Sequence, residues 1–287
     1  MTGPPTLDLP RKSFVAVLLV LLCTLIFEAW WVIGSADRFY SQAHALNIAK
    51  LVSLPVLVLL ILIILRDQKH FLKRLFARQG LTVRLVLTGI AIGIIARILA
   101  VSERVARLSF GVLVSPETTA EIAPNYIFAC PPAAVVITGA FVWLLFIPFA
   151  EEFVHRGVIL SAFAKRGPWV AVLVSALIFG LCHSPASSLW AFLFGVVLGI
   201  QYWNAGALWF PIITHATYDG LGLVHGVCGM LVWNPATSEL PLLGPGILAG
   251  FVALACAVTI FFLVSKKWVG LCQSNPNRNP NQNSRQA

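Results

Sequence analysis

Long apolar stretches follow one another along most of the chain, and they limit its fold more than any other feature. A helix needs about 20 apolar residues to cross the hydrocarbon core of a bilayer, and an isolated stretch of backbone in lipid satisfies its polar groups by forming a helix. Eight stretches are predicted as helical spans: 14–34, 47–65, 85–101, 133–164, 169–183, 187–203, 207–228 and 246–264. The sequence therefore predicts an all-α, polytopic membrane bundle of about eight transmembrane helices.

The composition agrees with a membrane protein and does not indicate nucleic-acid binding. The chain is 59% hydrophobic and 11% charged, whereas a soluble domain carries about 25% charged residues. Its net charge is +9, but most Lys and Arg residues lie near the ends of apolar stretches, as the positive-inside rule describes. We expect an integral, multi-pass protein of a prokaryotic plasma membrane with both termini in the cytosol. The basic residues assigned to the opposite side are Arg38, Lys50, Arg97, Arg104 and Arg107.

Five parts of the chain can be distinguished. Residues 1–12 form an N-terminal tail, and residues 13–132 hold the N-terminal transmembrane helices and a loop. Residues 133–228 carry the candidate site, and residues 229–264 form a loop and the last transmembrane helix. The C-terminal tail, 265–287, is polar and rich in Asn, Pro and Gln, which predicts disorder.

Two charged residues in the N-terminal spans have an ordinary interpretation. Glu28 lies beside Trp30 and Trp31, which is typical of a membrane interface, although a functional Glu28 is the alternative. Arg97 lies toward the end of its predicted span, from which its side chain could reach the interface by snorkelling.

The strongest candidate site is the segment 151–156, whose sequence is EEFVHR. Ionisable residues at membrane depth are costly and are functional candidates by default. On a helix, Glu151 and His155 share one face, while Glu152 and Arg156 share a neighbouring face and can form an ion pair. This polar stripe should therefore face a protein interior or a water-filled cavity.

The helix that carries this segment is longer than a membrane crossing requires. Residues 133–164 would extend almost 50 Å as a helix, at about 1.5 Å per residue. We expect this helix to tilt, to kink at Pro148, or to project into the cytosol.

Two further motifs can converge on the Glu pair. The turn at 165–168 joins two antiparallel helices, and Glu151 and His183 are equidistant from it, so they should face each other. His215 and Asp219 are four residues apart and share a helix face, so both can point at the same cavity. Phe179, one turn before His183, either fills the core or fixes the His183 imidazole.

These groups suit the hydrolysis of an amide bond. A carboxylate and an imidazole can activate a shared water, while a second imidazole donates to the oxyanion. The chain has no G-x-S-x-G or H-E-x-x-H motif, and the side chains of neighbouring Cys182 and His183 would diverge on a helix. No cofactor is required, but a zinc-dependent version is the alternative. Its ligands would be Glu151, Glu152, His183 and His215.

The three motifs resemble those of the CPBP family of intramembrane endopeptidases, which includes CAAX prenyl proteases and bacteriocin-processing proteins. Residues 151–156 match its E-E-x-x-x-R motif, residues 179–183 its F-x-x-x-H motif, and residues 215–219 its H-x-x-x-N/D motif. The motifs occur in the family's order, and the resemblance covers roughly 133–222.

This resemblance implies an eight-helix bundle with a conical intramembrane catalytic cavity that opens to the cytosol and the membrane. It implies that Glu151 activates water with His183, and that His215 and Asp219 line the oxyanion site. Arg156 would pair with Glu152 and hold the helix. The family's prenyl proteases usually have Asn in place of Asp219. An ionised Asp cannot donate a hydrogen bond. Asp219 is therefore either protonated or orients His215.

The leading hypothesis is an intramembrane endopeptidase that acts on a peptide or protein within the lipid bilayer. Candidate substrates are a prenylated C-terminal tail, a leader peptide and a C-terminal sorting segment. A non-catalytic membrane scaffold or immunity-type protein is the alternative from another class. A transporter is disfavoured because the sequence has no internal repeat.

Overall fold

The computed structural model describes residues 4–35, 38–39, 42–77, 81–114, 132–228, 243–267 and 269. Its described part contains helices and no strand, which confirms the all-α prediction. The chain begins with the helices α1 (Arg11–Ser35), α2 (Gln42–Ile64), α3 (Lys69–Leu75) and α4 (Val83–Val114). A continuous helical segment follows from Ala133 to Arg166, and the remaining helices are α9 (Pro168–Leu181), α10 (Pro185–Ala205), α11 (Trp209–Cys228) and α12 (Leu243–Val264).

Six helical segments of the described residues are long and apolar enough to cross a membrane: Arg11–Ser35, His44–Ile64, Val83–Gly111, Ala133–Arg166, Ser187–Ala205 and Gly246–Val264. The chain is therefore a multi-pass membrane protein. The other two predicted spans correspond to α9, a shorter apolar helix of 14 residues, and to α11. His183 follows the end of α9 by two residues, and α11 carries the His215 motif.

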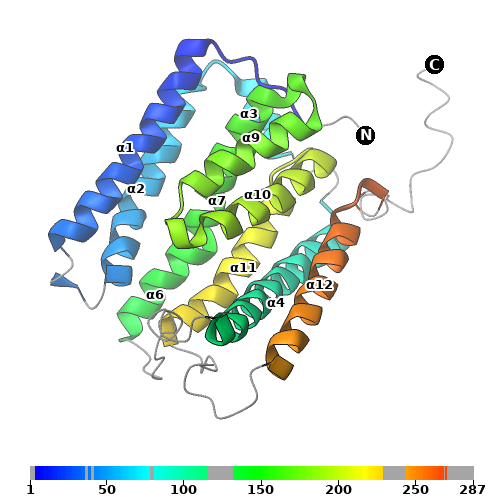
Figure 1. The fold of residues 1–287 in the computed structure, drawn as a ribbon. Helices are drawn as coiled ribbons and strands as arrows, with labels where there is room; N and C mark the ends of the chain where they lie inside the picture. Colours follow the sequence, from blue (N-terminus) through cyan, green and yellow to red (C-terminus); the bar gives the residue numbers. More distant parts are fainter. Residues whose placement is uncertain are drawn as a thin grey trace.

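The helices form three groups in space (Figure 1). α1 and α2 pack together on one side, and α4 and α12 pack together on the other. The helices that carry the three motifs lie between these two pairs. This arrangement surrounds the polar motifs with protein on both sides.

One predicted boundary is wrong in a way that matters for the site. The third span was expected to end at residue 101, but α4 continues to Val114. Arg97 therefore lies near the middle of a 32-residue helix instead of at its end. Most of the loop predicted within 229–264 lies outside the described residues, as does the C-terminal tail beyond residue 269.

The long helical segment departs from α geometry on both sides of the Glu pair. It consists of α6 (Ala133–Phe141), the π-helical segment η2 (Val142–Phe146), α7 (Ile147–Glu152), and the π-helical segment η3 (Phe153–Leu160). Pro148 lies at the start of α7, where it removes one backbone donor. π-helical turns are rare and occur often at functional sites. Two wider helical segments therefore flank α7, while the predicted tilt, kink at Pro148 or projection of this helix stays a prediction.

Several basic residues lie near helix ends on one side of the bundle, among them Arg11 at the start of α1, Lys73 in α3 and Lys266 after α12. α1 begins and α12 ends at the same end of the molecule, where α3 also lies (Figure 1). The N-terminal segment reaches the turn before α9, because Leu7 N donates to Ser161 O at 3.1 Å and Lys165 pairs with Asp8 at 3.1 Å. This arrangement agrees with termini on one side of the membrane, and their cytosolic location stays a prediction.

Small residues allow α4 to approach α11 closely. A Cβ atom on Gly93 would lie 2.6 Å from Thr217 Cβ and 2.7 Å from Thr214 O. Neither contact can be relieved by rotating a flexible side chain. Thr214 O is a backbone atom, and Thr217 Cβ is bonded directly to the backbone. Gly at position 93 therefore sets the distance between α4 and the helix that carries His215.

We expect Gly93→Ala to lower the free energy of unfolding by about 1–3 kcal/mol, because the added methyl group overpacks this interface. Thermal unfolding of the purified protein in detergent measures the effect. Gly250→Ala on α12 is the matched control, since a Cβ atom there has nothing within 4 Å. Equal unfolding midpoints for the two variants would contradict the packing argument.

Candidate active site

The predicted ion pair between Glu152 and Arg156 is present and fully buried. Arg156 Nη1 donates to Glu152 Oε1 at 2.8 Å, and neither side chain is exposed to solvent. Arg156 Nη2 also donates to the carbonyl oxygen of Gly195 on α10 at 3.1 Å. The guanidinium lies over the Phe179 ring, with Cζ 4.5 Å from the ring centroid. This pair therefore ties the Glu motif to α9 and α10.

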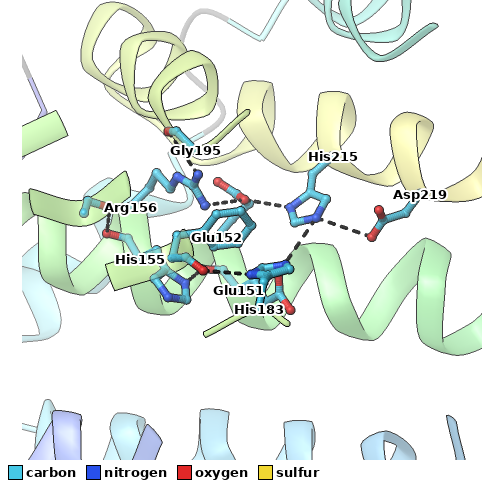
Figure 2. Close-up of polar contacts among 10 residues, drawn as sticks. Glu151, Glu152, His155, Arg156, His183, Gly195, His215 and Asp219 are labelled. Atoms are coloured by element: carbon cyan, nitrogen blue, oxygen red, sulfur yellow. Dashed lines mark hydrogen bonds and ion pairs between the residues drawn. The ribbon is translucent and has the colours of Figure 1, made fainter. Parts of the chain in front are cut away.

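Carboxylates lie at both nitrogens of His215 (Figure 2). Nδ1 is 2.7 Å from Glu152 Oε1, and Nε2 is 3.3 Å from Asp219 Oδ2. Nε2 is also 3.9 Å from Glu151 Oε2. Both nitrogens carry a proton only in the imidazolium form, which suits this arrangement. Asp219 thus contacts the ring that the sequence predicted it could orient.

His183 is oriented by the chain just before it. Its Nδ1 lies 2.7 Å from the carbonyl oxygen of Phe179. A carbonyl oxygen only accepts, so Nδ1 is the donor, and in the neutral ring Nε2 is the nitrogen that can accept. Glu151 and His183 both line one cavity, and the expectation that their side chains face each other stays a prediction.

Phe179 packs against every imidazole of the site. Its buried ring lies 4.6 Å from the His183 ring, 5.0 Å from the His155 ring and 6.0 Å from the His215 ring, measured between centroids. Together with its contact to Arg156, this makes Phe179 the common neighbour of three motifs. The structure therefore favours the interpretation in which Phe179 fixes the His183 imidazole.

The Glu151 carboxylate lines a cavity and has few contacts with the described chain. Its Oε2 atom is buried, has no hydrogen-bond partner among the described residues, and lies 3.9 Å from His215 Nε2. The side chain as a whole is 18% exposed and lines a cavity of about 600 Å³ whose wall includes His155, His183, His215 and Asp219. A carboxylate at such a cavity can accept a hydrogen bond from water or from a bound substrate.

His155 was placed in the polar stripe by the sequence, but its surroundings were not foreseen. It is 2% exposed, and its Nδ1 lies 2.9 Å from the backbone oxygen of Glu151. Its own carbonyl oxygen accepts a hydrogen bond from Ser175 Oγ at 2.8 Å. His155 thus links the backbone of the Glu motif to α9.

The first two helices also contribute charge to the cavity, which corrects the interfacial interpretation of Glu28. Glu28 is 5% exposed, accepts a hydrogen bond from Ser53 Oγ at 2.5 Å, and pairs with Lys50 Nζ at 3.2 Å. Glu28, Lys50 and Arg97 all line the cavity. The snorkelling predicted for Arg97 is therefore wrong as well, because its side chain faces the protein interior.

The four residues named as a possible zinc set do not converge on one point. Glu152 lies at Nδ1 of His215 and Glu151 lies at Nε2, so the imidazole ring separates the two carboxylates. Glu152 Oε1 is also engaged by Arg156. Within the described part of the chain, no group of three or more His, Cys, Asp or Glu side chains is placed to hold a metal ion. The four-ligand set does not fit this site.

Fold and site together define a multi-pass membrane protein with a carboxylate- and imidazole-lined cavity inside its helical bundle. Residues 133–221 match the family described as type II CAAX prenyl endopeptidase Rce1-like, which confirms the CPBP resemblance over that segment. The chain is also similar to an uncharacterized 24.3 kDa protein of Escherichia coli, with 29% identity over 99 residues. That match covers 32% of this chain and 45% of the Escherichia coli protein, which is less than half of its length.

Proposed function

We propose that this protein is an intramembrane endopeptidase in which Glu151 and His183 activate a water molecule. The partly exposed Glu151 carboxylate, at a cavity shared with His183 and His215, is the observation that carries this proposal. The match of residues 133–221 supports a CAAX-type intramembrane protease. The apolar spans around the cavity suit a peptide segment that arrives from the bilayer.

The proposed reaction needs no covalent intermediate. The water oxygen attacks the scissile carbonyl carbon while its proton passes to the Glu151 carboxylate. The carbonyl oxygen becomes an oxyanion that His215 stabilises with an N–H donor. The C–N bond then breaks, and the proton held by Glu151 goes to the leaving nitrogen to give an amine. The products are a new carboxylate and a new amino terminus.

Each supporting residue has a distinct part in this proposal. Glu152 accepts from His215 Nδ1 and so favours the charged ring that donates to an oxyanion. Asp219 orients the same ring from its Nε2 side, because the two groups are 3.3 Å apart. Arg156 compensates the buried charge of Glu152. Phe179 holds the imidazoles in place.

The substrate is a peptide or protein with a segment in the membrane. A prenylated tail, a leader peptide and a C-terminal sorting segment all meet this requirement. No metal ion is required in this proposal, because a carboxylate and an imidazole suffice to activate the water.

A comparison of protein termini in membranes from cells with the wild-type chain or with Glu151→Gln tests the proposed function. We expect a defined set of new amino termini that appears only with the wild type, since Glu151 takes the proton in the proposed reaction and a glutamine cannot. The same termini should form in wild-type membranes treated with a chelator. Identical termini in both membranes would refute the proteolytic function, and loss with chelator would show a metal-dependent reaction.

A further inference from the structure

A second pocket, of about 280 Å³, lies where the N-terminal segment packs against the end of the helical segment that carries the Glu motif. Its wall joins residues between 7 and 15 to residues between 162 and 166. Two membrane-spanning segments end here, since one begins at Arg11 and the other ends at Arg166. Trp169, which is 65% exposed, follows shortly after, and tryptophan is typical of the boundary between lipid chains and headgroups. The pocket therefore lies at the depth of the lipid headgroups.

The charged side chains of this pocket are mostly cations. Among the described residues, its wall contains Arg11, Lys165 and Arg166 and one acid, Asp8. Lys165 Nζ pairs with Asp8 Oδ2 at 3.1 Å, whereas none of the ion pairs among the described residues includes either arginine. Both arginines are exposed. Two guanidiniums in one pocket are thus available to an anion.

Apolar side chains lie beside these two guanidiniums. The rings of Phe14 and Phe163, both in the wall, pack edge to face with their centroids 5.8 Å apart. Arg166 Cζ lies 5.1 Å from the centroid of the Phe163 ring, which holds the guanidinium next to the apolar surface. Val15 extends this surface toward the membrane and is 52% exposed. A ligand that fills the pocket therefore needs both an anionic group and an apolar portion.

We propose that this pocket binds the phosphate and the first part of an acyl chain of an anionic phospholipid from the surrounding membrane. A guanidinium binds phosphate oxygens through paired N–H donors. A phospholipid presents its phosphate and its chains together at the depth of the pocket. A headgroup with its own cation would place that charge among the three cations of the wall, so the site favours a net negative headgroup. This inference goes beyond the proposed function and does not depend on it.

A lipid bound in this pocket would connect the N-terminal segment to the helical segment of the Glu motif. The two segments already meet, because Leu7 is 3% exposed and its N–H donates to Ser161 O at 3.1 Å. Arg11 belongs to the first segment and Arg166 to the second, so a phosphate between them contacts both. A ligand that binds only the packed arrangement stabilises it by mass action. We therefore expect anionic lipid to stabilise the folded protein.

Displacement of a fluorescent phosphatidylglycerol from the purified full chain in a non-ionic detergent tests this inference. Unlabelled phosphatidylglycerol should displace the probe about 25-fold more effectively than phosphatidylcholine with the same chains, at about fivefold for each of the two free arginines. Inorganic phosphate at the lipid concentration should displace little probe, because it has no apolar portion. Equal displacement by phosphatidylcholine would overturn the proposal. Displacement by inorganic phosphate as effective as by phosphatidylglycerol would assign the site to a free ion and would overturn it as well.

Substitutions of the two arginines locate the bound lipid. Arg11→Gln and Arg166→Gln should each weaken phosphatidylglycerol binding about fivefold, and the double variant about 25-fold. Arg74→Gln is the matched control, because Arg74 lies in α3 at the same end of the molecule and is not part of the pocket wall (Figure 1). Unchanged binding in the double variant, or an equal loss in Arg74→Gln, would show diffuse attraction to the basic end and would contradict a site.

Thermal unfolding separates loss of the lipid site from loss of the fold. Without added lipid, the double variant should unfold at the wild-type temperature, because both arginines are exposed and form no ion pair among the described residues. Phosphatidylglycerol should raise the midpoint of the wild type and leave that of the double variant unchanged. An equal rise in both proteins would refute the site. Glu151→Gln should bind the lipid as the wild type does, so a failure of the proteolytic function would leave this result intact.

Discussion

Glu151→Gln is expected to lower the rate of peptide cleavage by about 10²–10⁴-fold, the range that a general base contributes. The amide keeps the size and the hydrogen-bonding reach of the carboxylate but cannot take a proton from water. Among the described residues, Glu151 Oε2 accepts no hydrogen bond and lies 3.9 Å from His215 Nε2, so the substitution weakens one long ion pair and breaks no hydrogen bond of this atom. The protein should therefore stay folded and inserted.

Cleavage of a fluorogenic peptide by the purified protein in lipid vesicles measures this effect. Glu103→Gln is the matched control, because Glu103 is an exposed glutamate on α4 that pairs with Arg107 and does not line the cavity. The control should cleave at the wild-type rate. Wild-type activity in Glu151→Gln, with unchanged thermal unfolding, would remove Glu151 from the reaction.

Arg156→Met is expected to destabilise the protein by about 3–5 kcal/mol, which is the cost of leaving a buried charge without its partner. Glu152 is fully buried, and it would keep only His215 as a charged contact. The carbonyl oxygen of Gly195 would also lose its donor. Chemical or thermal unfolding in detergent measures the loss, and Arg107→Met, at an exposed ion pair, should change stability little.

The double variant Glu152→Leu with Arg156→Met separates stability from activity. Apolar residues of similar volume often replace a buried ion pair without loss of stability. We therefore expect the double variant to regain much of the stability that Arg156→Met loses. Its activity should stay low, because His215 Nδ1 no longer has a carboxylate acceptor. Recovery of both properties would show that Glu152 acts only on the fold.

Local helix geometry explains which parts of the site could be predicted from sequence. The Glu152–Arg156 pair and the His215–Asp219 contact both follow from a spacing of four residues on one helix. The shared cavity of Glu151 and His183 follows from a hairpin with a short turn. These arrangements involve residues on one helix or on two helices joined by a short turn. They can therefore be inferred from the spacing of the residues in the sequence.

Contacts between distant helices could not be predicted in the same way. A helix in lipid is apolar on all sides, so α1 and α2 carry no pattern that indicates which face meets the bundle. The burial of Glu28 and its pair with Lys50 therefore became visible only in the structure. The contact of His215 with Glu152 joins residues 63 positions apart and depends on how α11 packs against α7.

The two wider helical segments around α7 affect how relatives of this chain can be compared. Each π-helical turn accommodates about one more residue than an α-helical turn, so η2 and η3 each absorb an extra residue beside the Glu pair. Loss of one residue from η2 would let that turn return to α geometry while the spacing of Glu152 and Arg156 stayed the same. Loss of one residue between Glu152 and Arg156 would instead break the four-residue spacing on which their ion pair depends. Length differences among relatives can therefore be tolerated before the Glu pair but not within it.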